Sequence, residues 1–195
     1  MVNKIPDEYD NPIDTFIYNI IDKQLDFYYR NNFTPNKITT LSLLSGLTAA
    51  YSFYKDKYIL SGILILLSHY FDCADGKFAR KYNMVTELGD LYDHGSDFLK
   101  NILIIGLFYY KSKNESNKLN KFKKIIFLII IILVLLVLFL ECQEIIYNKN
   151  ESKTILRLNI FTTEQCKKNI IYLRCFAPGT FNIILALIVI FWKYI

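Results

Sequence analysis

One long apolar stretch constrains the fold of this chain more than any other feature. The residues from Ile125 to Leu140 include no polar or charged side chain, and they form the centre of a longer segment from Phe122 to Tyr147. A helix needs about 20 mainly apolar residues to cross the hydrocarbon core of a bilayer. Only a segment that satisfies its own backbone hydrogen bonds is stable there. The stretch therefore predicts a membrane-spanning helix.

Other segments of the chain extend this prediction to a bundle. The chain has 195 residues, 53% of them hydrophobic and 16% aromatic, which suits one domain with interfacial Tyr and Phe at its segment ends. The further predicted spans are 37–54, 57–82, 85–110 and 177–195. Residues 148–176 are too polar for an easy additional span. The fold class that we predict is an all-α, polytopic membrane helical bundle with about five to six transmembrane helices.

The N-terminal part has a different pattern. Between Asn11 and Arg30, apolar residues recur at helical spacing and charged residues stand between them. Asn11 is suited to cap such a helix, and Pro12 suits its first turn. The pattern is typical of an amphipathic helix on the membrane surface, although a helix packed against the core of a soluble protein has the same pattern. We therefore divide the chain into an N-terminal segment, residues 1–36, and a membrane domain, residues 37–195.

Acidic residues stand inside two neighbouring spans. One span ends with the run DCADGKFAR at 72–80, and the next contains Gly89, Asp93 and Asp97. Because a helix turns by about 100° per residue, the acids of each run share one face of their helix. Acidic side chains at membrane depth are costly, so they usually face a cavity and have a function. Two such helices side by side would direct four carboxylates to one point, and carboxylate oxygens are ligands for Mg²⁺ or Mn²⁺.

Small and basic residues accompany these acids. Gly76 and Ala79 leave room for a ligand near the helix backbone, and Arg80 is suited to a bidentate contact with a phosphate. A solvated helix face with ion pairs is the plain alternative for the acids, and Gly76 and Gly89 also suit close helix packing. His69, one turn before the first acid, is interpreted as a packing or interfacial residue rather than a ligand.

The complete run from Asp72 to Asp97 resembles the signature D-x2-D-G-x2-A-R-x8-G-x3-D-x3-D of the CDP-alcohol phosphotransferases, also called CDP-alcohol phosphatidyltransferases. The resemblance implies an integral, multi-pass membrane enzyme of phospholipid synthesis. In that family an alcohol hydroxyl attacks the β-phosphorus of a CDP-alcohol, and CMP leaves. The resemblance further implies Mg²⁺ or Mn²⁺ as the cofactor, with two ions as the expected number. It implies CDP-alcohol and lipid substrates as partners, and a homodimer as an expected assembly.

The same resemblance assigns roles by motif position. The residues that resemble the family's metal ligands are Asp72, Asp75, Asp93 and Asp97. Asp97 also resembles the general base, and a carboxylate within hydrogen-bond reach of the acceptor hydroxyl is able to take its proton. The residues that resemble contacts to the CDP moiety are Gly76, Arg80 and Thr86. Metal ions are able to bridge pyrophosphate oxygens and to stabilise the charge on the leaving CMP.

The substrates are indicated less specifically. The segment DHGSD at 93–97 resembles the DHGCD version of choline and ethanolamine phosphotransferases, with Ser96 in place of cysteine. This favours CDP-choline or CDP-ethanolamine as donor and diacylglycerol as acceptor. The competing interpretations are a CDP-diacylglycerol donor with inositol, serine or glycerol phosphate as acceptor, and an inactive, trimmed family member. A membrane prenyltransferase and a transporter with intramembrane acids are alternatives of other classes, and CMP release separates them.

Charge and cysteines add weaker constraints. The net charge of +5 suits contact with lipid headgroups, and since no nucleic-acid motif is visible, no nucleic-acid partner is expected. The four cysteines show no C-x2-C pairing, so we predict no disulfide framework. Cys73 is interpreted as a small filler between two acids. The sequence indicates no particular organelle.

Overall fold

The structure is a computed structural model that describes residue 6 and residues 9–113, 116–147 and 160–194. This part of the chain is helical and contains no strand. The α-helices are α1 (Pro12–Asp22), α2 (Leu25–Arg30), α3 (Pro35–Tyr54), α4 (Tyr58–Lys81), α5 (Glu87–Ser112), α6 (Ser116–Tyr147), α7 (Thr163–Leu173) and α8 (Pro178–Ile190), with a 3₁₀ turn, η2 (Arg174–Phe176), between the last two.

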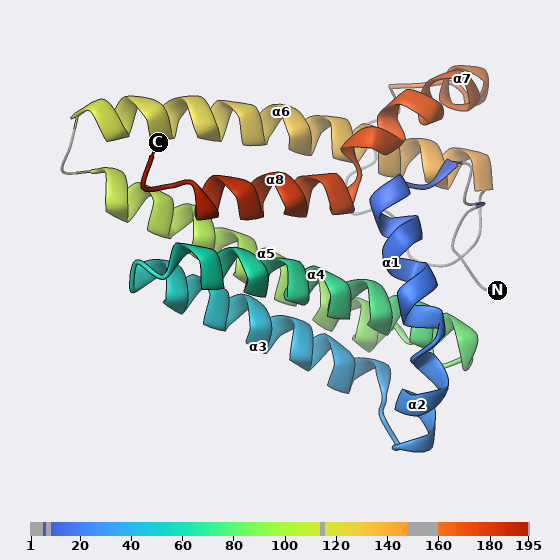
Figure 1. The fold of residues 1–195 in the computed structure, drawn as a ribbon. Helices are drawn as coiled ribbons and strands as arrows, with labels where there is room; N and C mark the ends of the chain where they lie inside the picture. Colours follow the sequence, from blue (N-terminus) through green and yellow to red (C-terminus); the bar gives the residue numbers. More distant parts are fainter. Residues whose placement is uncertain (1–5, 7–8, 114–115, 148–159, 195) are drawn as a thin grey trace.

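The long helices lie roughly along one direction, and α4 is central among them. Figure 1 shows α3, α4, α5, α6 and α8 side by side, while α1 crosses the end of the bundle where α4 finishes and α5 begins. α4 packs against α3, α8 and α1, and α6 packs against α7. The two predicted acidic runs therefore lie at the same end of the bundle.

Three helical segments in the described part are long and apolar enough to cross a membrane. They are Tyr58–Lys81, Leu119–Ile146 and Thr163–Ile190. α3 and α5 contain 20 and 26 residues but are not among these three, because both are more polar. Large apolar side chains are exposed on the outer surface of α6, as is expected for contact with lipid. The all-α membrane bundle is thus confirmed, whereas the number of five to six spans stays a prediction.

Small residues allow α4 to approach its neighbours closely. The hydroxyls of Ser42 and Ser68 each donate to the other residue's carbonyl oxygen at 2.9 Å, which joins α3 to α4. On another face of α4, a Cβ atom at Gly62 would collide with the Ile190 side chain and lie 3.1 Å from the Ala186 carbonyl oxygen of α8. Close packing of this kind is what associates helices in a membrane.

Gly62 and Gly106 form a matched pair for testing this packing. Gly62→Ala is expected to destabilise the protein by about 1–3 kcal/mol, because the methyl group has to displace α8. Gly106→Ala is expected to leave stability unchanged or to raise it slightly, because no atom of the described residues lies within 4 Å of the added Cβ. Thermal unfolding in detergent micelles measures both. Equal melting temperatures for the two variants would contradict the close α4–α8 contact.

The N-terminal segment is two helices rather than one. Asn11 caps α1 as predicted, since its side-chain oxygen accepts from the backbone N–H of Ile13 at 2.9 Å. The helix ends at Asp22, however, and the chain turns before α2 begins at Leu25. Phe16 and Phe27 are exposed, which suits a membrane-surface position. The division at residues 36 and 37 stays a prediction.

Polar contacts fix α1 and α2 to the bundle. The Asn11 amide donates to the Arg174 carbonyl oxygen at 2.7 Å and to the Thr180 hydroxyl at 2.9 Å. In α2, Asp26 accepts from the Lys81 ammonium at 2.6 Å and from the Tyr82 hydroxyl at 2.7 Å. These two hydrogen bonds hold the pKa of the Asp26 carboxyl below its usual value, and the bond from Lys81 has the larger effect. Both helices are therefore held against the end of the bundle that carries the acids.

The cysteine prediction is wrong in one respect. Cys142 of α6 and Cys166 of α7 form a disulfide, with their Cα atoms 4.9 Å apart. The two residues are 24 positions apart in the sequence, and only the packing of α7 against α6 brings them together. Spacing along the chain carries no signal for such a pair. Cys73 is a buried free cysteine and Cys175 an exposed one.

Candidate functional site

The candidate site lies where α4 ends and α5 begins. Residues 82–86 connect the two helices, so the last turns of α4 and the first turns of α5 stay close together. Asn83 adopts a positive φ of 54° in this connection. Asparagine tolerates this left-handed conformation better than most residues do. The short connection keeps both acidic runs at one depth in the bundle.

Three carboxylates converge at this place. One oxygen from each of Asp72, Asp93 and Asp97 lies within 4.8 Å of the others, and all three side chains are partly buried. Oδ1 of Asp93 is buried and has no hydrogen-bond partner among the residues that the structure describes. A buried carboxylate oxygen without a donor is costly, and a bound cation would satisfy it. The predicted convergence of the two runs is therefore present for these three acids.

Asp75 lies apart from this group. Its side chain is almost fully buried, and one of its oxygens accepts a hydrogen bond from the Thr39 hydroxyl of α3. It still interacts electrostatically with Asp93 and Asp72. The convergence of four carboxylates is thus observed for three of them, because the fourth is held by a neighbouring helix. The role of Asp75 as a metal ligand stays a prediction.

Lys100 is a member of the site that the motif did not indicate. Its ammonium lies 2.7 Å from Oδ1 of Asp97 and 3.5 Å from Oδ1 of Asp72, and it donates to the Ser42 hydroxyl at 2.8 Å. Its methylene chain passes over Gly46, where a Cβ atom would lie 2.5 Å from Cδ of the lysine. The sequence contains one signal for this role, because Lys100 is a charged residue inside a predicted span and follows Asp97 by three residues.

Lys100 is expected to stabilise the site most when divalent metal is absent. Lys100→Met removes the ammonium that faces two close carboxylates, and the loss is expected to cost about 1.5–3 kcal/mol in chelator and less in Mg²⁺, which takes over the compensation of charge. Lys111→Met is the control, because Lys111 pairs with Asp56 at 2.6 Å and that pair lies outside the carboxylate group. Its effect on the melting temperature should not depend on Mg²⁺. A metal-independent effect of Lys100→Met would contradict this account.

The predicted contacts to CDP line the same end of the helices. The Thr86 hydroxyl accepts from the Gly89 N–H at 3.1 Å and so caps α5. A Cβ atom at Gly89 would lie 3.0 Å from this hydroxyl oxygen, so a larger residue would require the hydroxyl to shift slightly. At the end of α4, a Cβ atom at Gly76 would lie 3.2 Å from a guanidinium nitrogen of Arg80. Arg80 therefore lies over Gly76, but contacts of Gly76, Arg80 and Thr86 with CDP stay predictions.

The donor set suits a hard divalent cation. All three converging donors are carboxylate oxygens, which Mg²⁺ and Mn²⁺ prefer over nitrogen or sulfur ligands. The buried, unpartnered oxygen of Asp93 is the specific feature that a cation would satisfy. The residues present therefore fit a metal site, and the helix ends beside it carry basic and small residues suited to a phosphate.

Comparison with known proteins identifies the class. The family model of the CDP-alcohol phosphatidyltransferases matches residues 32–194, which include the carboxylate site and every long helix. The chain belongs to the CDP-alcohol phosphatidyltransferase family. With three helices suited to cross a bilayer, it is an integral membrane protein.

Particular relatives are similar over shorter stretches. An archaetidylinositol phosphate synthase of Pyrococcus horikoshii is 35% identical over 72 residues, which are 37% of this chain and 38% of that protein. Choline/ethanolaminephosphotransferase 2 of Arabidopsis thaliana is 38% identical over 76 residues, which are 33% of this chain and 20% of that protein. An uncharacterized protein of Aquifex aeolicus is 28% identical over 100 residues, 50% of this chain and 51% of that protein. No solved structure matches the chain significantly.

Proposed function

We propose that this protein transfers a phospho-alcohol group from a CDP-alcohol to an acceptor hydroxyl in a membrane and releases CMP. The observation that carries the proposal is the convergence of Asp72, Asp93 and Asp97, with a buried oxygen of Asp93 left for a cation. Family membership over residues 32–194 supports the same reaction class. The matched stretches span only 20–51% of the length of the curated relatives described above, so the activity of the whole protein is part of the proposal.

The residues of the site have separate tasks in this reaction. Asp72, Asp93 and Asp97 would hold Mg²⁺ or Mn²⁺, with Asp75 beside them and two ions as the proposed number. When bound, the metal would supply positive charge for the pyrophosphate and for the leaving CMP. The Asp97 carboxylate takes the proton of the acceptor hydroxyl. The hydroxyl oxygen forms a bond to the β-phosphorus, and the bond from that phosphorus to the CMP oxygen breaks. Arg80 lies over Gly76 at the end of α4 and is placed to contact a phosphate.

The donor that we favour is CDP-choline or CDP-ethanolamine, with diacylglycerol as acceptor. The DHGSD segment at 93–97 and the similarity to the Arabidopsis choline/ethanolaminephosphotransferase support this choice. Leu91 and Phe98 are exposed on α5 next to the acids and suit contact with acyl chains. The archaetidylinositol phosphate synthase supports the second candidate, a CDP-diacylglycerol-type lipid donor with a polar alcohol such as an inositol, serine or glycerol phosphate as acceptor. A homodimer is proposed from the family resemblance alone.

A donor panel tests the function and names the substrate together. The full chain is purified in detergent and mixed with Mn²⁺ or Mg²⁺, diacylglycerol and each of CDP-choline, CDP-ethanolamine and CDP-diacylglycerol, the last also with polar alcohols. CMP release with a CDP-aminoalcohol supports the favoured reaction. Release only with CDP-diacylglycerol supports the second candidate. If no donor yields CMP above the level of a heat-treated sample, the protein is an inactive family member and the proposal is wrong.

A further inference from the structure

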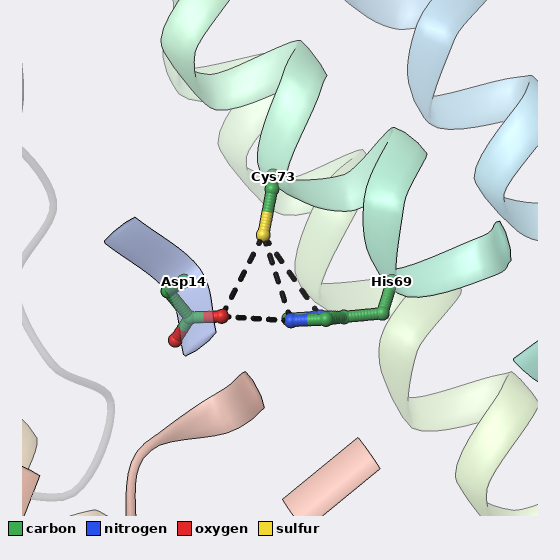
Figure 2. Close-up of side chains that lie close together, drawn as sticks. All are labelled: Asp14, His69 and Cys73. Atoms are coloured by element: carbon green, nitrogen blue, oxygen red, sulfur yellow. Dashed lines mark hydrogen bonds and ion pairs between the residues drawn. The ribbon is translucent and has the colours of Figure 1, made fainter. Parts of the chain in front are cut away.

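A second group of ligand-type side chains lies outside the carboxylate site. Asp14 of α1 points toward His69 and Cys73 of α4 (Figure 2). The exposed fractions are only 3% for Asp14, 4% for His69 and 8% for Cys73. The sequence interpretation of His69 as a packing residue and of Cys73 as a filler therefore misses that these two polar groups meet each other and a carboxylate.

The distances within this group suit a shared metal ion. Nε2 of His69 lies 2.8 Å from Oδ1 of Asp14 and 3.6 Å from Sγ of Cys73, and the sulfur lies 4.0 Å from the same carboxylate oxygen. Tetrahedral zinc at its usual bond lengths separates such donors by about 3.3–3.6 Å. Shifts of about half an ångström would therefore form the site. His69 and Cys73 are four residues apart on α4, so they present their donors on one face of the helix.

Outer partners orient two of the three side chains. The Gly179 N–H at the start of α8 donates to Oδ2 of Asp14 at 3.1 Å, which leaves Oδ1 directed toward His69. The side-chain nitrogen of Asn182 lies 3.2 Å from Nδ1 of His69, so Asn182 occupies this side of the ring and leaves Nε2 for the group. Gly179 is required here, because a Cβ atom would collide with the Asp14 carboxylate. Outer hydrogen-bond partners of this kind typically fix the orientation of metal-binding histidines and carboxylates.

We propose that Asp14, His69 and Cys73 bind a zinc ion that joins the N-terminal helix α1 to α4. On binding, Cys73 loses its thiol proton to solvent, and His69 coordinates through Nε2 with its ring proton on Nδ1. The Asn182 side chain, whose nitrogen donates to the Pro178 carbonyl oxygen at 3.0 Å, then turns its amide oxygen toward Nδ1 to accept that proton's hydrogen bond. One thiolate, one carboxylate and a divalent ion add to zero net charge, which suits a buried position. Three protein donors leave a fourth position for water.

The donor types separate this site from the carboxylate site. Sulfur and imidazole ligands favour zinc, whereas Asp72, Asp93 and Asp97 offer oxygen alone and favour Mg²⁺ or Mn²⁺. Cys73 directly follows Asp72 on α4, so a zinc ion would hold α1 against the helix that carries part of the carboxylate site. The proposal does not depend on the transfer reaction, because it concerns binding by a separate set of residues.

Cobalt titration tests the site with a spectroscopic signal specific for thiolate ligands. The full chain in detergent, treated with chelator under non-reducing conditions, is titrated with Co²⁺ and followed by absorption. We expect a thiolate-to-cobalt charge-transfer band that saturates at one ion per chain and disappears when Zn²⁺ is added. Cys73→Ser should abolish the band. Cys175→Ser, which changes the exposed free cysteine, should preserve it.

Two further variants separate a metal site from a hydrogen-bonded triad. Asn182→Leu is expected to weaken cobalt binding about 10–100-fold, because it removes the outer partner of His69 without touching a ligand. The double variant Asp93→Asn/Asp97→Asn should retain the band, since the carboxylate site contributes no sulfur. No band in the folded wild-type protein, or an unchanged band in Cys73→Ser, would show a hydrogen-bonded triad only and overturn the proposal.

Discussion

Replacing Asp97 by Asn is expected to lower the rate of CMP release by about 10²–10⁴-fold. The amide has the size of the carboxylate but cannot take the proton of the acceptor hydroxyl. It also removes one charge from the three carboxylates that lie within 4.8 Å of one another. Because the lost group is proposed to act both as a base and as a metal ligand, additional Mn²⁺ should not restore the rate. The measurement is CMP release by the purified variant with the best donor of the panel.

Asp90→Asn is the matched control for this variant. Asp90 lies in the first turns of the same helix but is exposed, and its Oδ1 lies 3.8 Å from Nδ1 of His94 rather than in the carboxylate group. Its replacement should leave the rate of CMP release unchanged. A wild-type rate in Asp97→Asn, or an equal loss in both variants, would show that the carboxylate group does not supply the base.

Divalent metal is expected to stabilise the folded protein. Without metal, three close carboxylates repel one another, and Lys100 compensates only part of their charge. Mg²⁺ at about 100 times its dissociation constant should add about 2.7 kcal/mol to the free energy of unfolding. For a chain of this length, that corresponds to a rise in melting temperature of roughly 5–10 °C. Thermal unfolding in detergent with chelator and then with Mg²⁺ measures the effect.

Asp93→Asn should remove most of this stabilisation by Mg²⁺. The variant loses the proposed ligand whose buried oxygen has no hydrogen-bond partner among the described residues. The relief of repulsion should at the same time make the metal-free protein more stable. Mg²⁺ is chosen because it avoids sulfur ligands and therefore does not report on the Asp14–His69–Cys73 group. A melting temperature that Mg²⁺ leaves unchanged in the wild type would argue against a metal site at these acids.

The positions of the helices follow largely from the sequence. Hydropathy predicts α4, α6 and α8, and the Asn11-Pro12 pair predicts the start of α1. Periodicity does not predict the turn between Asp22 and Leu25, because apolar positions continue through it. It also does not predict that Asp14, which stands among the polar positions of the N-terminal pattern, is buried against α4 and α8. Such burial depends on partners that are far away in the sequence, namely His69 and Gly179.

The candidate site was predictable in outline and not in its details. Fixed spacing places Asp72, Asp93 and Asp97 at one end of two neighbouring helices, and a short connection between the helices makes them converge. The separate environment of Asp75 depends on Thr39 from α3, and the position of Lys100 depends on the space that Gly46 leaves. These features arise from contacts between helices, which a motif within two helices does not describe.

Binding of Mn²⁺ to the full chain tests the central claim most directly. Free Mn²⁺ is followed by electron paramagnetic resonance while it is added to the purified protein in detergent. The account predicts saturable binding that Asp72→Asn and Asp93→Asn each weaken strongly and that Asp90→Asn leaves unchanged. Absence of saturable binding in the wild-type protein, or equal binding by all four proteins, would contradict a metal site formed jointly by α4 and α5.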